Sequence, residues 1–414
     1  MRLSIILSPT AISTGIHGLG LALRLLFMMV LVRESTPAVL GMFGLLTAID
    51  LIVIYAAGFE LHTFSTRRYA RHPTPSQLRI CFALHTRVFR FATPLAALVA
   101  MAAAWLFDVN LDVTSYLCFG LVVATGTVVQ ELSRYLVLTA KPIRSIVTSF
   151  LRTAGWMPFA LLFIGNEQQT MRNITVAWAI ASTLAALWGM HALREAFSRH
   201  LRIRTRFALH AFSRSASYYA VATAAVLQSN IERFLLQLML GPTAVGIYSL
   251  FVTLANTLTA LVQAGVLNIF LPRLLTAFGG LTADRRAVLR EACKRALLVC
   301  LAMAVAIMIA SVPIVKLTDH SAYLEYLWIL PALLVGQTVL MWSQPVHLAI
   351  YGAHHDRLLL TITVTSLVVS LAVSSVLIHV AGIAGAAAAP VLVSAGMAYA
   401  RWRAFARLEA RGVA

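Results

Sequence analysis

Residues Thr36 to Leu46 read TPAVLGMFGLL, and 205 positions later Gly241 to Phe251 read GPTAVGIYSLF. The two stretches align without a gap, and each follows a short turn between two long apolar runs. The aligned pairs include Pro37 with Pro242, Gly41 with Gly246, Phe43 with Tyr248 and Leu45 with Leu250. This repeat predicts a membrane protein built from two like halves, and proteins of this kind commonly carry a substrate path between the halves.

The composition is that of a polytopic membrane protein. Of the 414 residues, 60% are hydrophobic and only 12% are charged, whereas a soluble protein is usually about one quarter charged. Apolar runs of roughly twenty residues recur along the chain, each long enough to cross a hydrocarbon layer about 30 Å thick. The predicted fold class is therefore an all-α membrane protein with about twelve transmembrane helices.

Two pseudo-symmetric six-helix lobes are expected, an N-terminal lobe at residues 1–200 and a C-terminal lobe at residues 201–414. The twelve expected spans are 11–32, 38–60, 86–107, 113–136, 143–164, 174–193, 215–238, 244–271, 296–316, 323–351, 358–379 and 382–402.

The basic residues indicate how these spans are oriented. The formal net charge is +18, and the basic residues gather after every second span and in the C-terminal tail. Examples are Arg67, Arg68 and Arg71, then Arg285, Arg286 and Arg290, and finally Arg401, Arg403, Arg407 and Arg411. Because basic residues accumulate in cytoplasmic loops, both termini are expected in the cytoplasm. The same rule explains the positive charge, so no nucleic-acid partner is expected.

The chain carries no motif for catalysis or metal binding. His354, His355 and Asp356 form the one compact cluster of metal-ligand types, but adjacent residues do not easily converge on one ion, so a polar turn is expected. No P-loop, GxSxG or HExxH motif occurs, and these mark the common nucleotide, hydrolase and zinc sites. The sequence therefore predicts a protein that is not an enzyme, with no catalytic residue, cofactor or metal.

Charges inside the predicted spans are the strongest residue-level signal. A charge at the bilayer centre costs at least ~2.5 kcal/mol on insertion scales, so such residues face a cavity or a partner. Arg24 lies near the middle of the first span, either to contact an anionic substrate or to pair with Asp50 in the second span. Arg152 lies inside the fifth span, and Glu131 and Arg134 are spaced to form an ion pair on one helix face.

The second half places polar groups at the corresponding depth. Arg24 aligns with Ser229, which is followed by Asn230, and Glu232 and Arg233 come next. Adjacent helical residues point about 100° apart, so Glu232 and Arg233 are not expected to pair with each other. Substrate-binding candidates are Arg24, Arg152, Asn230 and Arg233, and candidates for coupling to a proton or sodium ion are Asp50, Glu60 and Glu232. Arginine in this setting suits phosphate or sugar-acid groups.

With these residues in view, the chain resembles the polysaccharide and O-antigen flippases (Wzx-type) of the MOP/MATE-like exporter superfamily. The resemblance rests on the repeated Gly-aromatic step, on Asn230-Ile231-Glu232-Arg233 running into Leu240-Gly241, on Leu271-Pro272-Arg273, and on Gly382-Ile383-Ala384-Gly385-Ala386. That family usually has Asp before the arginine, and Glu232 departs from this pattern.

The resemblance implies two six-helix bundles that alternately open a cationic cavity to either side of a bacterial inner membrane. The cargo would be a polyprenyl-pyrophosphate-linked oligosaccharide, carried for synthesis of surface polysaccharide such as O-antigen, lipopolysaccharide or exopolysaccharide. Implied partners are this lipid-linked oligosaccharide, membrane lipids, and a polysaccharide polymerase with its chain-length regulator.

Three alternatives remain open from the sequence. A MATE-type cation-coupled exporter of drugs or small solutes shares the architecture, although an acidic residue in the first span would favour it and Arg24 stands there instead. A membrane polymerase or acyltransferase would need a longer outer loop or a convergent catalytic motif. A lipid II-type flippase of the same superfamily typically has two helices more than the twelve expected here.

Overall fold

The structure is a computed structural model, and it describes residues 9–63, 65, 74–194, 205–281, 285–317 and 321–410. These described residues form helices and no strand, which confirms the predicted all-α class. Contacts divide the chain into two compact units, Met1–Thr223 and Ala224–Ala414. The predicted boundary between residues 200 and 201 lies outside the described residues.

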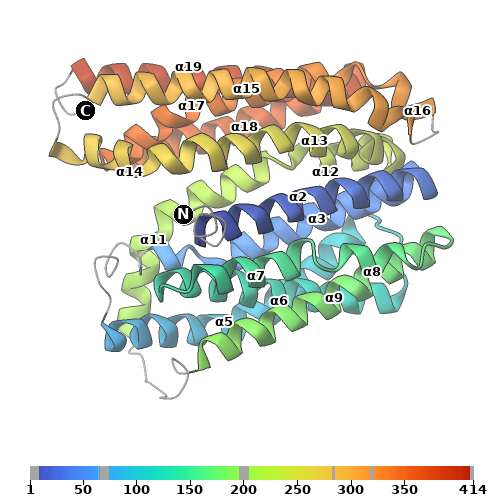
Figure 1. The fold of residues 1–414 in the computed structure, drawn as a ribbon, viewed down its shortest axis with the longest axis horizontal. Helices are drawn as coiled ribbons and strands as arrows, with labels where there is room; N and C mark the ends of the chain where they lie inside the picture. Colours follow the sequence, from blue (N-terminus) through green and yellow to red (C-terminus); the bar gives the residue numbers. More distant parts are fainter. Residues whose placement is uncertain are drawn as a thin grey trace, which may run out of the picture. The chain divides into compact units, whose positions relative to one another are not determined.

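The first unit is built around helix α6, which packs against α5, α7 and α9 (Figure 1). Its helices are α2 (Pro9–Glu34), α3 (Pro37–Gly58), α5 (Pro75–Leu106), α6 (Val113–Leu138), α7 (Pro142–Thr153), α8 (Met157–Leu161), α9 (Glu167–Ala192) and most of α11 (Thr205–Gln228). Aromatic rings fill its core. Trp156 stacks on Trp178 with ring centroids 5.4 Å apart, and the repeat residue Phe43 meets Trp156 edge-on at 5.9 Å.

The second unit is built around helix α17, which packs against α19, α15 and α13 (Figure 1). Its helices are α12 (Ile231–Leu240), α13 (Pro242–Val262), the π-helix η1 (Gln263–Leu267), α14 (Asn268–Thr276), the π-helix η2 (Ala277–Leu281), α15 (Arg285–Lys316), α16 (Ser321–Glu325), α17 (Ile329–Gly352), α18 (Asp356–Ala381) and α19 (Ile383–Ala410).

The sequence repeat marks the start of a helix in both units. Helix α3 begins at Pro37 and α13 begins at Pro242, the aligned proline. Proline suits the first helical turn because its missing N–H would have no partner there. Residues 39–46 of α3 and 244–252 of α13 are buried throughout, so each copy of the repeat forms a core helix of its unit.

Ten helices of the described chain are long and apolar enough to cross a membrane. Two of the twelve expected spans have no counterpart among these ten helices. The segment predicted at 143–164 is broken between α7 and α8, where Pro158 cannot donate a helical hydrogen bond. The segment predicted at 215–238 is broken between α11 and α12. There the side-chain amide of Asn230 donates to the Val226 carbonyl and competes with the backbone hydrogen bonds of the helix.

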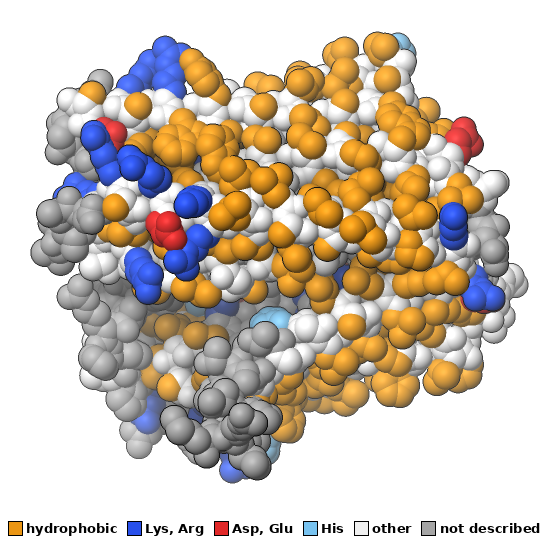
Figure 2. All heavy atoms as spheres, turned by 45° about the horizontal axis from the view of Figure 1, so that its top comes forward, with side chains coloured by type: hydrophobic (Ala, Val, Ile, Leu, Met, Phe, Trp, Pro, Cys, Tyr) orange, Lys and Arg blue, Asp and Glu red, His pale blue; other side chains and the backbone are white. Residues whose placement is uncertain are grey.

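The protein surface fits a lipid environment. Figure 2 shows one face covered largely by apolar side chains, with Lys and Arg gathered towards one end. On α15, Val305 and Ile309 are 60% and 70% exposed. Arg286, at the start of α15, pairs with Glu409 at the end of α19 at 2.5 Å, so both helices carry charge at that end. Exposed apolar helices ending in charged residues match a hydrocarbon layer with polar boundaries.

Candidate functional site: charged networks within the two units

The end of α3 positions a charged network in the described part of the first unit. Phe59 and Glu60 both have left-handed backbone conformations, with φ of 48° and 49°, which are uncommon for residues other than glycine. This double reversal sends the two side chains to different neighbours. Phe59 packs edge-on against Phe212 of α11 at 5.3 Å, whereas Glu60 lies 3.4 Å from Arg134 of α6.

Arg134 bridges two carboxylates in this network. Its Nη1 lies 2.7 Å from Glu131 Oε1, which confirms the ion pair predicted from their spacing, and its Nη2 contacts Glu60. The second oxygen of Glu131 lies 3.5 Å from Nδ1 of the buried His85, on α5. Burial, and then the charge of Arg134, lower the pKa of His62 to about 3, so this neighbour of Glu60 is a neutral imidazole.

Asp50 and Arg152 form a second ion pair in the same unit. Arg152 Nη2 lies 2.5 Å from Asp50 Oδ2, and the two side chains are only 11% and 8% exposed. Gly126 of α6 gives the guanidinium room, because a Cβ at that position would lie 2.8 Å from Arg152 Nε. In the described part of this unit, three buried carboxylates thus face two guanidinium groups.

A small polar cavity of about 220 Å³ opens between α3, α6 and α7. Its lining includes both guanidinium groups and several neutral polar side chains, namely Tyr55, Gln130, Ser133, Arg134, Ser149 and Arg152. The cavity is smaller than the roughly 300–1,000 Å³ of typical ligand pockets, so it suits water or a small ion.

Arg24 does not form the ion pair with Asp50 that was one of its two expected roles. Asp50 pairs with Arg152, and among the described residues no carboxylate lies within ion-pair distance of Arg24. Arg24 is exposed, and it lies one turn before the buried Phe27 on α2. Arg24 is therefore a guanidinium near the middle of an apolar helix without an acidic partner in the described chain.

In the second unit the predicted residues Asn230, Glu232 and Arg233 lie at, or just after, the break between α11 and α12. Asn230 is buried and its Oδ1 accepts a 2.8 Å hydrogen bond from Arg233. Glu232 is 5% exposed and accepts a 3.0 Å hydrogen bond from Ser374 of α18. Glu232 and Arg233 do not pair, as expected for neighbours on one helix. Among the described residues, no guanidinium or ammonium lies within ion-pair distance of Glu232.

Arg401 is buried, which was not predicted: it was counted with the basic C-terminal tail, although it falls inside the expected span 382–402. It is 5% exposed inside α19, where Nη1 donates to Ser343 Oγ at 2.9 Å and to Gln344 Oε1 at 3.1 Å. Helix α19 continues to Ala410, so Arg401 lies two to three turns before its end. A signal was available, because Arg401 follows an apolar run without a turn residue between them.

Comparisons with known proteins identify the fold. No protein family matches the chain by sequence, and no curated protein does so either. The structure is similar to the lipid II flippase MurJ in an inward closed conformation, with TM-score 0.73 and 11% identity over 95% of this chain and 87% of that one. It is similar to an inward-facing multidrug resistance MATE family transporter, with TM-score 0.69 and 14% identity over 94% and 95%.

The Vibrio cholerae MATE transporter VcmN also matches, with TM-score 0.57 and 12% identity over 97% of this chain and 95% of that chain. The chain has the fold of the MOP-superfamily transporters. At these identities the likeness establishes the architecture, and the role of each charged residue has to be argued from its own surroundings.

Proposed function

We propose that this protein is a flippase of a bacterial inner membrane that moves a polyprenyl-pyrophosphate-linked oligosaccharide between leaflets by alternating access. The fold supports this proposal, because MurJ, which has the same fold, is a lipid II flippase. Both termini are proposed to lie in the cytoplasm. The proposed partners are membrane lipids, a polysaccharide polymerase and its chain-length regulator. Surface polysaccharide synthesis is the process it would serve.

The observation that carries the proposal is the surroundings of Arg24. This guanidinium lies near the middle of the Gly15–Glu34 span and has no acidic partner in the described chain. An unpartnered charge at that depth is costly unless it faces a cavity or meets an opposite charge. A pyrophosphate group supplies such a charge, and a guanidinium binds it through two parallel hydrogen bonds. Arg152, Asn230 and Arg233 are proposed as the other substrate-binding residues.

A transport assay tests the proposal directly. The purified protein is reconstituted into liposomes that carry a fluorescent polyprenyl-pyrophosphate disaccharide, and the label reaching the far leaflet is measured. We expect the wild type to flip the lipid, and we expect Arg24→Ala and Arg24→Lys to lose most of this activity. The matched control is Arg33→Ala, because Arg33 lies at the end of the same helix and is an exposed partner of Glu34. Normal flipping by both Arg24 variants would remove Arg24 from the site.

Coupling to an ion gradient is proposed to involve Glu232. Of the three candidates, Asp50 and Glu60 already face guanidinium groups, whereas Glu232 is buried with a serine hydroxyl as its hydrogen-bond partner. A buried carboxyl in this setting is suited to bind and release a proton. Flipping driven by a pH gradient is expected to decrease in Glu232→Gln and to persist in the surface control Glu291→Gln. Equal gradient dependence in wild type and Glu232→Gln would exclude this role.

A second candidate function is cation-coupled export of drugs or small solutes. It is favoured by the likeness to the MATE transporter over 95% of that chain and by the excess of buried carboxylates in the first unit. The same liposomes distinguish the two functions. Exchange of a cationic dye for protons, without movement of the lipid-linked sugar, would favour the exporter.

A further inference from the structure

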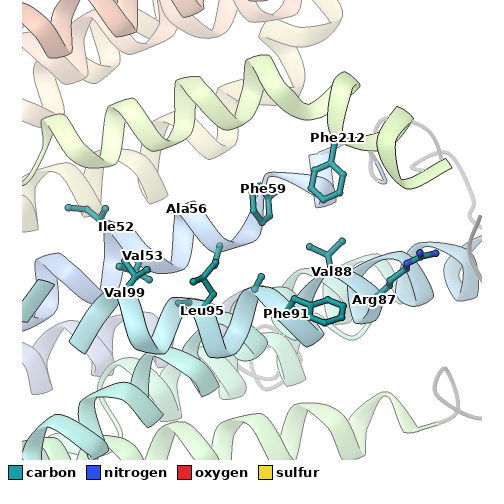
Figure 3. A pocket seen from close by; sticks show the side chains of 13 residues that line it. Ile52, Val53, Ala56, Phe59, Arg87, Val88, Phe91, Leu95, Val99 and Phe212 are labelled. Carbon is teal, nitrogen blue, oxygen red and sulfur yellow. The ribbon is translucent and has the colours of Figure 1, made fainter. Parts of the chain in front are cut away.

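The structure assigns to the first unit a binding groove for the apolar chain of the phosphate-linked carrier lipid, an inference that rests on the proposed flippase function. The groove has a volume of about 550 Å³ and lies between α3, α5 and the first half of α11 (Figure 3). It is separate from the polar cavity that Arg134 and Arg152 line, since the two share no lining residue.

The walls of the groove are apolar along its length. Helix α3 contributes Ile52 and Ala56, and α5 contributes Ala92 and Leu95. Figure 3 shows Ile52, Ala56 and Leu95 along the two helices, with Phe59, Phe91 and Phe212 nearer the end where Arg87 lies. On α5 bulky and small side chains alternate along the groove, from Phe91 and Ala92 to Leu95 and Ala96. Such an apolar wall offers many van der Waals contacts to a hydrocarbon chain.

The length of the groove matches one leaflet of a bilayer. Arg87 and Val99 mark its two ends on α5, and twelve residues of helix rise about 18 Å. One leaflet of a typical hydrocarbon core is about 15 Å thick. Phe91 and Leu95 are 71% and 61% exposed, so the groove is open along one side to a chain entering from the lipid.

One end of the groove carries positive charge. Arg87 is exposed and, among the described residues, is the charged one that lines the groove. The neighbouring Arg90, also exposed, lies over the Phe91 ring at 6.0 Å. Arg87 and Arg90 lie near the middle of α5 (Pro75–Leu106), just before its apolar stretch from Phe91 to Leu106. Because basic residues accumulate on the cytoplasmic side, this point of the helix is expected at the cytoplasmic boundary of the membrane. An Arg-flanked mouth above an apolar channel complements a lipid with a phosphate head and a single chain, because guanidinium binds phosphate well.

The proposed occupant is the polyprenyl chain, rather than a bulk phospholipid. The proposal takes one apolar chain lying between α3 and α5, with its phosphate at the Arg87 end. Holding the polyprenyl chain here would keep it in lipid contact and close to the protein while the polar head crosses.

Photocrosslinking tests the assignment. The full-length protein in nanodiscs is irradiated with a diazirine-bearing polyprenyl phosphate, and labelled peptides are located by mass spectrometry. We expect labels on α3, α5 and the start of α11, displaced by unlabelled polyprenyl phosphate and not by phosphatidylglycerol. Ala56→Trp and Ala92→Trp, which fill the groove from opposite walls, are expected to reduce labelling there about tenfold. The matched control is Ala102→Trp, because Ala102 is an exposed residue of α5 that does not line the groove.

The charged mouth is tested in the same assay. Arg87→Gln is expected to weaken probe binding about tenfold, as expected for the loss of a charge-assisted hydrogen bond. The control Arg172→Gln removes an exposed arginine at the start of α9, away from the groove, and is expected to bind normally. Equal binding by Arg87→Gln and wild type would overturn the role of Arg87 and with it the assigned orientation of the lipid.

The outcomes separate this inference from the proposed function. Displacement of the probe by phosphatidylglycerol identifies an ordinary lipid site and overturns the assignment, as do labels that map to other helices. A wild-type protein that flips the carrier while Ala56→Trp and Ala92→Trp flip it equally well refutes the groove and leaves the flippase standing. A wild-type protein that is labelled in the groove but does not flip refutes the flippase and leaves the lipid site standing.

Discussion

Removal of the Arg152 guanidinium is expected to destabilise the first unit strongly. Its Nη2 lies 2.5 Å from Asp50 Oδ2, and the Asp50 side chain is 8% exposed. Arg152→Ala would leave this buried carboxylate without its partner. Breaking a buried ion pair from one side costs about 3–5 kcal/mol, mainly because the remaining charge is not solvated. For a unit of 223 residues, that corresponds to a melting temperature lower by roughly 10 °C.

The matched variant replaces both members of the pair. Asp50→Asn combined with Arg152→Gln leaves no buried charge at this position, and replacing a whole buried pair is often close to neutral for stability. We therefore expect the double variant to recover at least half of the stability that Arg152→Ala loses. Intrinsic fluorescence follows unfolding of this unit, because the stacked rings of Trp156 and Trp178 lie in its core.

Two results would refute this reasoning. One is a single Arg152→Ala variant that melts with the wild type, and the other is a double variant no more stable than the single one. The double variant also separates structure from transport. If it folds normally and flips normally, the guanidinium of Arg152 serves the ion pair and does not bind substrate. If it folds normally and does not flip, the proposed role of Arg152 as an anion ligand is supported.

Two further predictions concern the helices that surround this pair. Gly126→Ala would place a Cβ 2.8 Å from Arg152 Nε and 2.7 Å from Ile54 Cδ1. We therefore expect the free energy of unfolding, measured by thermal denaturation, to fall by about 1–3 kcal/mol. An unchanged melting temperature would contradict the close approach. Asp112 caps α6 by accepting a 2.8 Å hydrogen bond from the Ser115 amide, and Asp112→Ala should cost about 1 kcal/mol at pH 7. Hydrogen bonds from Ser115 lower the pKa of Asp112, so the stabilisation by its carboxylate is lost as the pH falls and the group becomes protonated. The melting curves of the wild type and Asp112→Ala should therefore converge below about pH 4. Curves that stay apart at low pH would contradict the cap.

Membrane location, helical class and the two-part construction can be predicted from local patterns in the sequence. Apolar runs of span length leave few alternatives in a membrane, because each backbone polar group must be paired within its own helix. The repeat at Pro37 and Pro242 predicted equivalent helices, and both begin at those prolines. The pair Glu131–Arg134 was predictable for the same reason, because both residues stand on one turn of one helix.

The partners of the other charges depended on how helices pack, and spacing along the chain does not encode that. Asp50 and Arg152 are 102 residues apart, and Asp50 could have paired with Arg24 until packing placed α7 beside it. The left-handed turn at Phe59 and Glu60, which points one ring into the lipid groove and one carboxylate at Arg134, also became apparent only in the folded chain. A span is defined by its own composition, whereas an ion pair or a groove is defined by atoms that different helices bring together.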